Sequence, residues 1–320
     1  MNALVTVFGG SGFLGRYVVR ALAQQGYRIR VGVRHPQLAN YLLPMGRVGQ
    51  LQLVKANVLS PDAVAAALKG ASAAVNLVGV LQESGRQRFA AIHAEAAGTI
   101  ARAAADAGVN SLVHVSALGA DPSSDAAYGR SKAEGETKVR QAFPQATILR
   151  PSILFGTEDN FFNRFAALAR IAPVLPLVGG GKTRFQPAFV GDVAKAVERC
   201  LREPAARGQT YELGGPATFS FRELMELILR ETGRRRRLMP LPFPIASLMG
   251  QLLQVLPNAP LTADQVRLLK RDNVVSKGAL TFADLGIEPE PVEAIVPTYL
   301  WRFRREGQYE QEPRGTVGVA

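Results

Sequence analysis

A glycine-rich loop near the start of the chain constrains the fold more than any other feature of the sequence. It reads Gly9, Gly10, Ser11, Gly12, Phe13, Leu14 and Gly15. The loop follows an apolar run at 4–8, a predicted strand, and opens a helical pattern at 16–25. In that context Gly9 permits a tight turn, Gly12 lets the backbone approach a pyrophosphate, and Gly15 lets the helix pack closely on the strand. The positive end of a helix starting near Phe13 then holds the phosphates, so we predict that these seven residues bind a dinucleotide.

The rest of the first half alternates apolar runs with helical patterns, which is typical of a parallel sheet covered by helices. Further strands are predicted at 28–33, 51–55, 73–77, 111–115 and 146–149, and helices at 61–68, 89–107 and 128–142. A strand at 209–213 and a helix at 221–232 are predicted beyond them. The fold class is therefore α/β, a Rossmann-type doubly wound parallel sheet with a smaller C-terminal lobe.

Proline and glycine become frequent after Pro151, and the regular alternation ends there. We therefore expect a dinucleotide-binding Rossmann domain over residues 1–155, with residues 186–213 packing back on it. Residues 156–300 are expected to form an interleaved lobe, and residues 301–320 a mobile tail. A chain of 320 residues is long enough for both parts.

Composition narrows the classes of protein. One cysteine, Cys200, excludes a disulfide framework, and three scattered histidines give no metal-ligand spacing. A net charge of +12 indicates an anionic neighbour such as phosphate, an acidic protein surface or lipid headgroups. Neither interleaved aromatic residues nor a recognition motif accompanies the charge, so nucleic acid is not an expected partner. We expect no signal peptide, because residues 4–8 already read as a strand.

The end of the second predicted strand decides between the two nicotinamide dinucleotides. NAD-specific sites place a carboxylate there, whereas this chain has Arg34 and no carboxylate side chain before Asp62. An arginine at this position can clamp a 2′-phosphate, so the expected cofactor is NADPH. Asn57 and Val58 follow the third strand and are expected to contact the adenine. Leu77, Val78 and Gly79 follow the fourth and are expected to line the ribose side.

Tyr128 and Lys132 lie at positions i and i+4 of a predicted helix, and hence on one face of it. A neighbouring ammonium is expected to lower the pKa of the phenol, so that it can exchange a proton with an alcohol or carbonyl. Ser116 ends the fifth strand, at the edge where such sheets bind ligands, and its hydroxyl could hold the reacting oxygen.

This combination resembles the short-chain dehydrogenase/reductase superfamily, including its extended members. Residues 150–156, which contain Pro151, look like the segment that follows the sixth strand there, so Pro151 is expected at the cofactor. Residues 186–194 look like a later stretch of the same proteins. The resemblance implies hydride transfer from a nicotinamide, with Tyr128, Lys132 and Ser116 catalytic if the protein is active.

A closer resemblance is to the NADPH-binding accessory subunit of respiratory complex I and its bacterial relatives. It is carried by residues 43–51, 75–79, 114–116, 155–165 and 241–244. It implies a peripheral subunit near the quinone-binding region, at the cytoplasmic face of a bacterial inner membrane, with NADPH held for structural reasons. Tyr128 and Lys132 would then bind the cofactor, and complex I peripheral-arm subunits would be the partners.

Alternatives remain open at this point. A free-standing NADP-dependent reductase, epimerase or dehydratase would use the same residues. Residues 238–257 carry no charge, but three prolines would interrupt a membrane-spanning helix. The amphipathic segment at 245–256 follows four arginines at 234–237, and it either covers the substrate cleft or lies on a membrane or partner.

Overall fold

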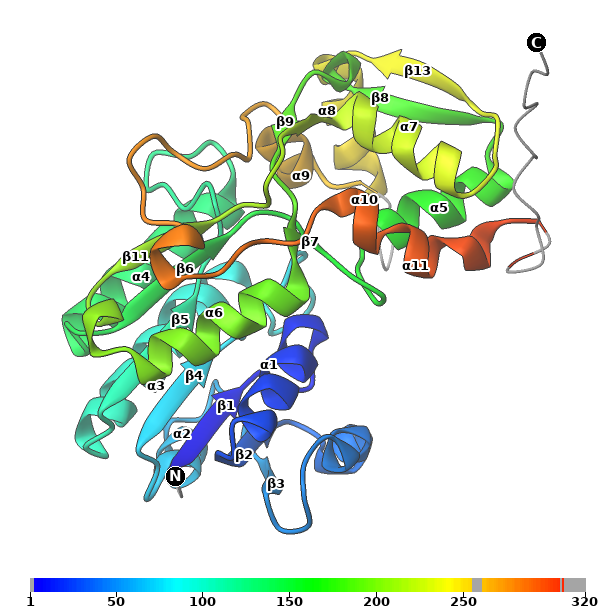
Figure 1. Cartoon of the computed structure of the whole chain (residues 1–320). Coiled ribbons are helices and arrows are strands. Elements are labelled where there is room, and N and C mark those ends of the chain that lie inside the picture. The colour runs from blue at the N-terminus through cyan, green and yellow to red at the C-terminus, as the bar shows by residue number, and fades with distance from the viewer. Residues whose placement is uncertain (1–2, 255–260, 306, 308–320) are drawn as a thin grey trace.

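The computed structural model describes residues 3–254, 261–305 and 307. Its centre is a sheet of seven parallel strands in the order β11-β6-β5-β4-β1-β2-β3 (Figure 1). The strands are β1 (Leu4–Phe8), β2 (Arg28–Val33), β3 (Leu51–Lys55), β4 (Ala73–Asn76), β5 (Ser111–Val115), β6 (Thr147–Pro151) and β11 (Thr210–Leu213). The predicted Rossmann sheet is confirmed, and the strand predicted at 209–213 extends it beside β6.

Helices cover both faces of this sheet, as a doubly wound fold requires. On one face α1 (Phe13–Gln24) and α6 (Val190–Arg202) pack on Val5, Val31 and Val113. On the other face lie α2 (Pro61–Leu68), α3 (Ala96–Asp106) and α4 (Ala127–Ala142), which bury Leu112 and Ile148. Since all seven strands are parallel, their carboxyl ends meet along one edge of the sheet.

The helix predicted at 89–107 is divided. Its first part is the π-helical turn η2 (Ala90–Glu95), and α3 follows it. A methyl group on Gly135 of α4 would lie 2.0 Å from the carbonyl oxygen of His93. Glycine at 135 therefore lets α4 approach the π-helical turn η2 closely. Hydrophobic periodicity does not reveal this contact.

The C-terminal lobe is built on the parallel pair β8 (Val174–Val178) and β13 (Arg237–Leu241). Around it lie α5 (Phe162–Ile171), α7 (Phe221–Glu231), α8 (Phe243–Leu253), α9 (Ala263–Leu268), α10 (Val292–Ile295) and α11 (Pro297–Leu300). Two-stranded pairs join β7 (Leu154–Phe155) to β10 (Ala188–Phe189) and β9 (Arg184–Phe185) to β12 (Phe219–Ser220). The lobe has its own core, in which Phe162, Phe185 and Phe221 are buried.

Short 3-10 segments complete the chain: η1 (Pro36–Met45), η3 (Gly179–Gly181), η4 (Pro204–Ala206), η5 (Ala283–Leu285) and η6 (Trp301–Phe303). Of the tail expected to be mobile, residues 301–305 are described and carry η6, and Gly307 is also described; the remainder lies outside the described residues. The uncharged stretch from 238 contributes to β13 and α8. None of the helices in the described parts of the chain is long and apolar enough to span a bilayer.

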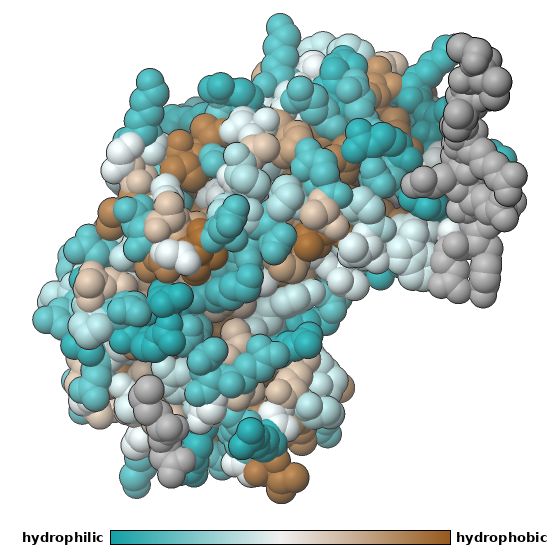
Figure 2. Space-filling view, in the orientation of Figure 1, coloured by the Kyte–Doolittle hydropathy of each residue, from teal (hydrophilic) through white to brown (hydrophobic). Residues whose placement is uncertain are grey.

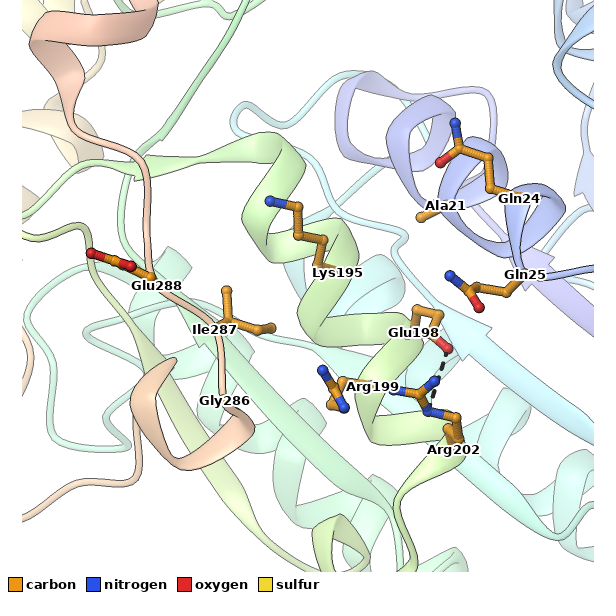
Figure 3. A pocket seen from close by; sticks show the side chains of 10 residues that line it. All are labelled: Ala21, Gln24, Gln25, Lys195, Glu198, Arg199, Arg202, Gly286, Ile287 and Glu288. Carbon is orange, nitrogen blue, oxygen red and sulfur yellow. Dashed lines mark ion pairs between the residues drawn. The ribbon is translucent and has the colours of Figure 1, made fainter.

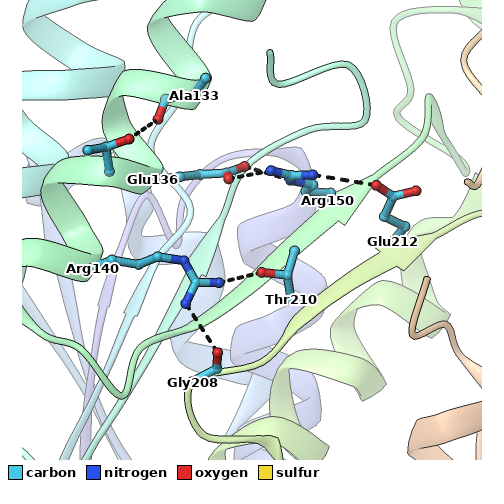
Figure 4. A network of polar contacts seen from close by, with 8 residues as sticks. Ala133, Glu136, Arg140, Arg150, Gly208, Thr210 and Glu212 are labelled. Carbon is cyan, nitrogen blue, oxygen red and sulfur yellow. Dashed lines mark hydrogen bonds and ion pairs between the residues drawn. The ribbon is translucent and has the colours of Figure 1, made fainter. Parts of the chain in front are cut away.

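A polar network connects α4 to β6 and to the edge strand β11 (Figure 4). Arg150 of β6 donates to both carboxylate oxygens of Glu136, at 2.9 and 2.7 Å, and lies 3.5 Å from Glu212 of β11. Arg140 donates to the carbonyl oxygen of Gly208, at 3.1 Å, and to the hydroxyl of Thr210. These contacts fix the helix that carries Tyr128 and Lys132.

Candidate functional site

The glycine loop has the geometry that its sequence predicts. Gly9 has φ +80°, a left-handed conformation that favours glycine, and its carbonyl accepts from the Gly12 amide at 3.0 Å. A methyl group on Gly15 would lie 2.2 Å from the same carbonyl oxygen, so only glycine lets α1 pack this closely on the loop. Helix α1 begins at Phe13, and Gly12 is exposed. The loop therefore presents its backbone, and the N-terminus of the twelve-residue helix α1, to a ligand.

The segment after β4 lies against this loop. A methyl group on Gly9 would stand 3.1 Å from the Leu77 carbonyl carbon and from the Val78 amide nitrogen. Gly79 faces α4, because its added methyl would lie 3.3 Å from Nζ of Lys132. The structure thus brings the predicted pyrophosphate loop, the predicted ribose-side residues and Lys132 to one edge of the sheet.

Other predicted cofactor residues lie at the same edge. Arg34 directly follows β2 and is exposed, with no hydrogen bond or ion pair to the residues that the structure describes. Asn57 is exposed, and its side-chain oxygen accepts from the Leu59 amide at 3.1 Å, which shapes the turn after β3. Val58 packs against the core beside α2, and Pro151 ends β6.

Ser116 directly follows β5, and Tyr128 and Lys132 lie on α4 beside the end of that strand. Ser116 is 3% exposed, and its hydroxyl has no hydrogen-bond partner among the described residues. Lys132 is buried; its Nζ donates to the Val115 carbonyl at 3.3 Å and lies 5.9 Å from the centre of the Tyr128 ring. A buried hydroxyl without a partner costs free energy, so its position fits a site that a ligand oxygen completes.

The expected lowering of the Tyr128 pKa by Lys132 is wrong in this structure. Burial raises the pKa of the Tyr128 phenol to about 12. Burial also lowers the pKa of Lys132 to about 8, against the opposing effect of Glu136. The desolvation that disfavours the Tyr128 phenolate also disfavours the Lys132 ammonium, and sequence spacing carries no information on desolvation.

Two buried histidines extend the site, and the sequence reasoning assigned neither a role. His93 of η2 accepts from the Val80 amide at its Nε2, 3.0 Å away, and its Nδ1 lies 2.9 Å from the hydroxyl of Ser131. The Ser131 hydroxyl already donates to the Tyr128 carbonyl, so it accepts from Nδ1–H of His93. Burial, with Lys132 nearby, lowers the pKa of His93 to about 3 and keeps it neutral.

His114 adopts the opposite tautomer. The Asn76 oxygen accepts from the Val78 amide at 3.1 Å, so the Asn76 amide nitrogen donates to Nδ1 of His114 at 3.0 Å. The proton of His114 is then on Nε2, which is buried without a partner among the described residues. Since residues two apart on a strand share a face, His114 lies on the same side of β5 as Ser116. That i, i+2 spacing is the signal that could have found it.

The C-terminal lobe reaches this site through Asp264 of α9. Its carboxylate accepts from the amides of Ala127 and Tyr128, at 2.7 and 3.0 Å, and so satisfies the first turn of α4. Phe89 stacks on His93 and meets the Tyr128 ring edge-on, with ring centres 5.4 and 5.8 Å apart. A cavity of about 520 Å³ adjoins them, lined by Glu83, Phe89, Ala127, Gln251, Gln254, Ala263, Asp264 and Arg267.

A second cavity, of about 560 Å³, lies between α1, α6 and residues 286–288 (Figure 3). It is lined by Gln24 and Gln25 at the end of α1 opposite the glycine loop. Lys195, Arg199 and Arg202 of α6 project around it and pair with carboxylates of their own helix or of Glu203. This cavity is separate from the predicted dinucleotide site.

The strand order and the glycine loop at the edge of the sheet together define a protein of the Rossmann-fold class. Residues 5–214 match the model of the NAD dependent epimerase/dehydratase family. An NADPH-dependent quinone oxidoreductase from Escherichia coli, solved with NADPH, has the same fold, with a TM-score of 0.74 over 93% of this chain and 99% of that chain at 22% identity.

Similarity to curated proteins spans both lobes. Subunit 9 of the NADH dehydrogenase [ubiquinone] 1 alpha subcomplex of Arabidopsis thaliana is 35% identical, over 95% of this chain and 79% of that protein. The 40 kDa subunit of NADH-ubiquinone oxidoreductase from Neurospora crassa is 32% identical over 96% and 81%. A ceramide reductase of Caulobacter vibrioides is 31% identical over 79% and 78%. The chain therefore belongs to the NAD dependent epimerase/dehydratase family. Within it, the chain belongs to the family of complex I accessory subunits that includes the Arabidopsis and Neurospora proteins.

Proposed function

We propose that this protein is an NADPH-binding accessory subunit of respiratory complex I, with a mainly structural cofactor. The observation that carries the proposal is the similarity to subunit 9, which extends over 95% of this chain and so includes the lobe as well as the Rossmann domain. The proposed location is peripheral, at the cytoplasmic face of a bacterial inner membrane and near the quinone-binding region. The partners would be peripheral-arm subunits, with contact to anionic lipid headgroups.

NADPH is the proposed cofactor because of residues present at the site. The backbone of residues 9–15 would hold the pyrophosphate, and Arg34, exposed and unpaired with the described residues, would hold a 2′-phosphate. Asn57 and Val58 would contact the adenine, and Leu77, Val78, Gly79 and Pro151 would line the ribose and nicotinamide side. Lys132 would donate to the nicotinamide ribose. A bound nicotinamide supplies hydride chemistry, whereas these residues supply binding and orientation.

The test is to isolate the native protein from detergent-solubilised membranes and analyse its nucleotide after denaturation. We expect it to co-purify with complex I subunits and to release about one NADP(H) per chain. Finding it wholly in the soluble fraction, without those subunits, would contradict the proposed assembly. An empty site in a protein that still co-purifies would contradict the structural cofactor alone.

The second candidate is a free-standing NADP-dependent reductase of the same superfamily. The retained set Ser116, Tyr128 and Lys132 favours it, as does the similarity to a ceramide reductase. Tyr128→Phe removes the phenolic hydroxyl, and with it the exchangeable proton, and keeps the ring. A reductase is expected to lose cofactor turnover on a carbonyl substrate while keeping its NADPH affinity; equal turnover in the variant would eliminate this role for Tyr128.

A further inference from the structure

Helix α8 turns its large apolar side chains outward. Ile245, Leu248, Met249 and Leu252 are 52%, 58%, 40% and 67% exposed. Their i, i+3, i+4, i+7 spacing places them on one stripe of the helix. An amphipathic helix of a globular domain ordinarily buries such a stripe, whereas the residues that the structure describes leave this one uncovered.

The buried side of α8 is made of small residues. Ala246 and Gly250 are its buried positions, and a methyl group on Gly250 would lie 2.8 Å from the backbone nitrogen of Ala263. The helix therefore sits close against α9 by its narrow side. The outward direction of the stripe is consequently fixed by packing, and turning α8 inward would force the larger side chains into backbone.

A further exposed apolar side chain lies on β13, the strand that leads into α8. Within the described sheets this strand pairs only with β8, and it lies along the outer edge of the lobe (Figure 1). Met239 is 54% exposed, and Arg237, two residues earlier on the same strand, shares its face. Hydrophobic side chains are visible among hydrophilic ones on the surface of this lobe (Figure 2).

The segment that contains β13 and α8 is positively charged. Residues 232–263 contain four arginines and no aspartate or glutamate. Arg236 donates to the Ala169 carbonyl at 2.8 Å, and Arg234 to the Phe303 carbonyl at 3.0 Å, so both serve the lobe itself. The side chains of Arg235 and Arg237 are exposed and make no hydrogen bond or ion pair with the described residues.

We infer that the outward stripe of α8, with Met239, Arg235 and Arg237, is a docking surface for an anionic lipid bilayer. An apolar helix face buried at the level of the headgroups, with arginines beside it, is the chemistry by which a peripheral helix holds such a surface. The charge pattern favours lipid over a second copy of this chain, because two copies would bring arginines together. This inference deepens the proposed membrane-side location and rests on it.

The experiment uses the full chain and sedimentation with vesicles of phosphatidylcholine, with or without phosphatidylglycerol. We expect binding to the anionic vesicles and weaker binding as salt rises, because salt screens exposed arginines. Replacing Arg235 and Arg237 together with glutamine should lower the partition coefficient about 30-fold, the equivalent of about 1 kcal/mol for each arginine. Leu248→Ser with Leu252→Ser should lower it further by removing the buried area.

Matched variants distinguish binding through this face from non-specific adsorption to vesicles. Leu38, an apolar side chain 73% exposed on the Rossmann domain, is the control for the stripe, and Leu38→Ser should leave binding unchanged. Trp301 is the single tryptophan, so Leu252→Trp with Trp301→Phe reports on the stripe alone. We expect its emission to shift to the blue with anionic vesicles. Thermal unfolding checks that each variant is folded.

The outcomes are distinguishable from those of the proposed function. If the protein co-purifies with complex I but stays in solution with anionic vesicles, the lipid inference is overturned and the assembly stands. If a concentration-dependent dimer forms that the serine variant abolishes, the face joins two copies and the inference is again overturned. Binding to anionic vesicles through the stripe without complex I subunits would support the docking surface and contradict the assembly.

Discussion

At the scale of single residues, burial decides the chemistry of this site. His93 and His114 hold opposite tautomers, because one accepts from a backbone amide at Nε2 and the other accepts from Asn76 at Nδ1. Both rings are neutral, so neither can offset the positive charge of Lys132 in the same pocket. The Lys132 amine and the Nε2–H of His114, unpartnered among the described residues, are suited to hold an uncharged or negative oxygen near Ser116.

The histidines predict acid sensitivity. The pKa of each falls from 6.5 to about 3 in the folded protein, so between those values the unfolded chain binds more protons. The free energy of unfolding should therefore decrease as pH falls from 6.5, by up to about 1.4 kcal/mol per pH unit for each histidine. Urea unfolding at pH 7, 6, 5 and 4 measures this slope. His114→Gln should flatten it, whereas His35→Gln, at an exposed position, should not.

Arg34 predicts cofactor preference. Arg34→Ala should weaken NADPH binding by about 10- to 100-fold, since hydrogen bonds to charged groups contribute about 1.5–3 kcal/mol. NADH lacks the 2′-phosphate, so its affinity should not change. Titration followed by nucleotide fluorescence measures both. The matched control is Arg20→Ala, an exposed arginine on α1; equal losses for the two nucleotides would contradict the assignment.

At the scale of elements, two glycines of the loop between β1 and α1 have different roles: Gly15 serves helix packing and Gly12 serves the proposed nucleotide binding. Gly15→Ala places a methyl 2.2 Å from the Gly9 carbonyl oxygen, which forces α1 off the loop and should destabilise the protein by more than about 2 kcal/mol. Gly12→Ala meets that oxygen at 3.3 Å and has an ordinary φ of −77°. This variant should fold and lose NADPH affinity. Urea unfolding and nucleotide titration distinguish the two effects.

Helix α4 depends on the lobe for its cap. Its N-cap residue, Ala126, has no side-chain oxygen, and Asp264 from α9 supplies the missing acceptor. Asp264→Ala should destabilise the protein by about 1–2 kcal/mol. Asp106→Ala, an exposed carboxylate on α3, is the control. If both substitutions cost the same in chemical unfolding, the interdomain cap has no special weight.

The limits of sequence reasoning follow from these elements. The strands were predictable because short runs such as 4–8 and 28–33 are apolar and bounded by glycine or polar residues. The glycine loop was predictable because its requirements are local. Asp264 lies 136 residues from Tyr128, and no local pattern links them. The Tyr128 pKa depends on what buries it, and the π turn at His93 depends on Gly135 of another helix.

At the scale of the whole molecule, a polar joint between the two lobes lies at the carboxyl edge of the sheet. Besides Asp264, Arg271 pairs with Asp121 at 2.7 Å, and the Asn273 side chain accepts from the Ser152 hydroxyl at 2.6 Å and the Ile153 amide at 3.2 Å. These contacts connect residues 261–273 to the loops that follow β5 and β6. A ligand that orders those loops should therefore also steady the lobe and its docking surface.

This coupling gives the last prediction. NADPH at a free concentration 100 times its dissociation constant should raise the free energy of unfolding by about 2.7 kcal/mol. If the cofactor is structural, it should also slow proteolytic cleavage within the lobe, because local opening there breaks the joint with the Rossmann domain. Tyr128→Phe should retain both effects, whereas Asp264→Ala should retain the stabilisation and lose the protection of the lobe. Protection that survives in Asp264→Ala would show that the lobe is held independently of the cofactor, and NADPH would then serve the Rossmann domain alone.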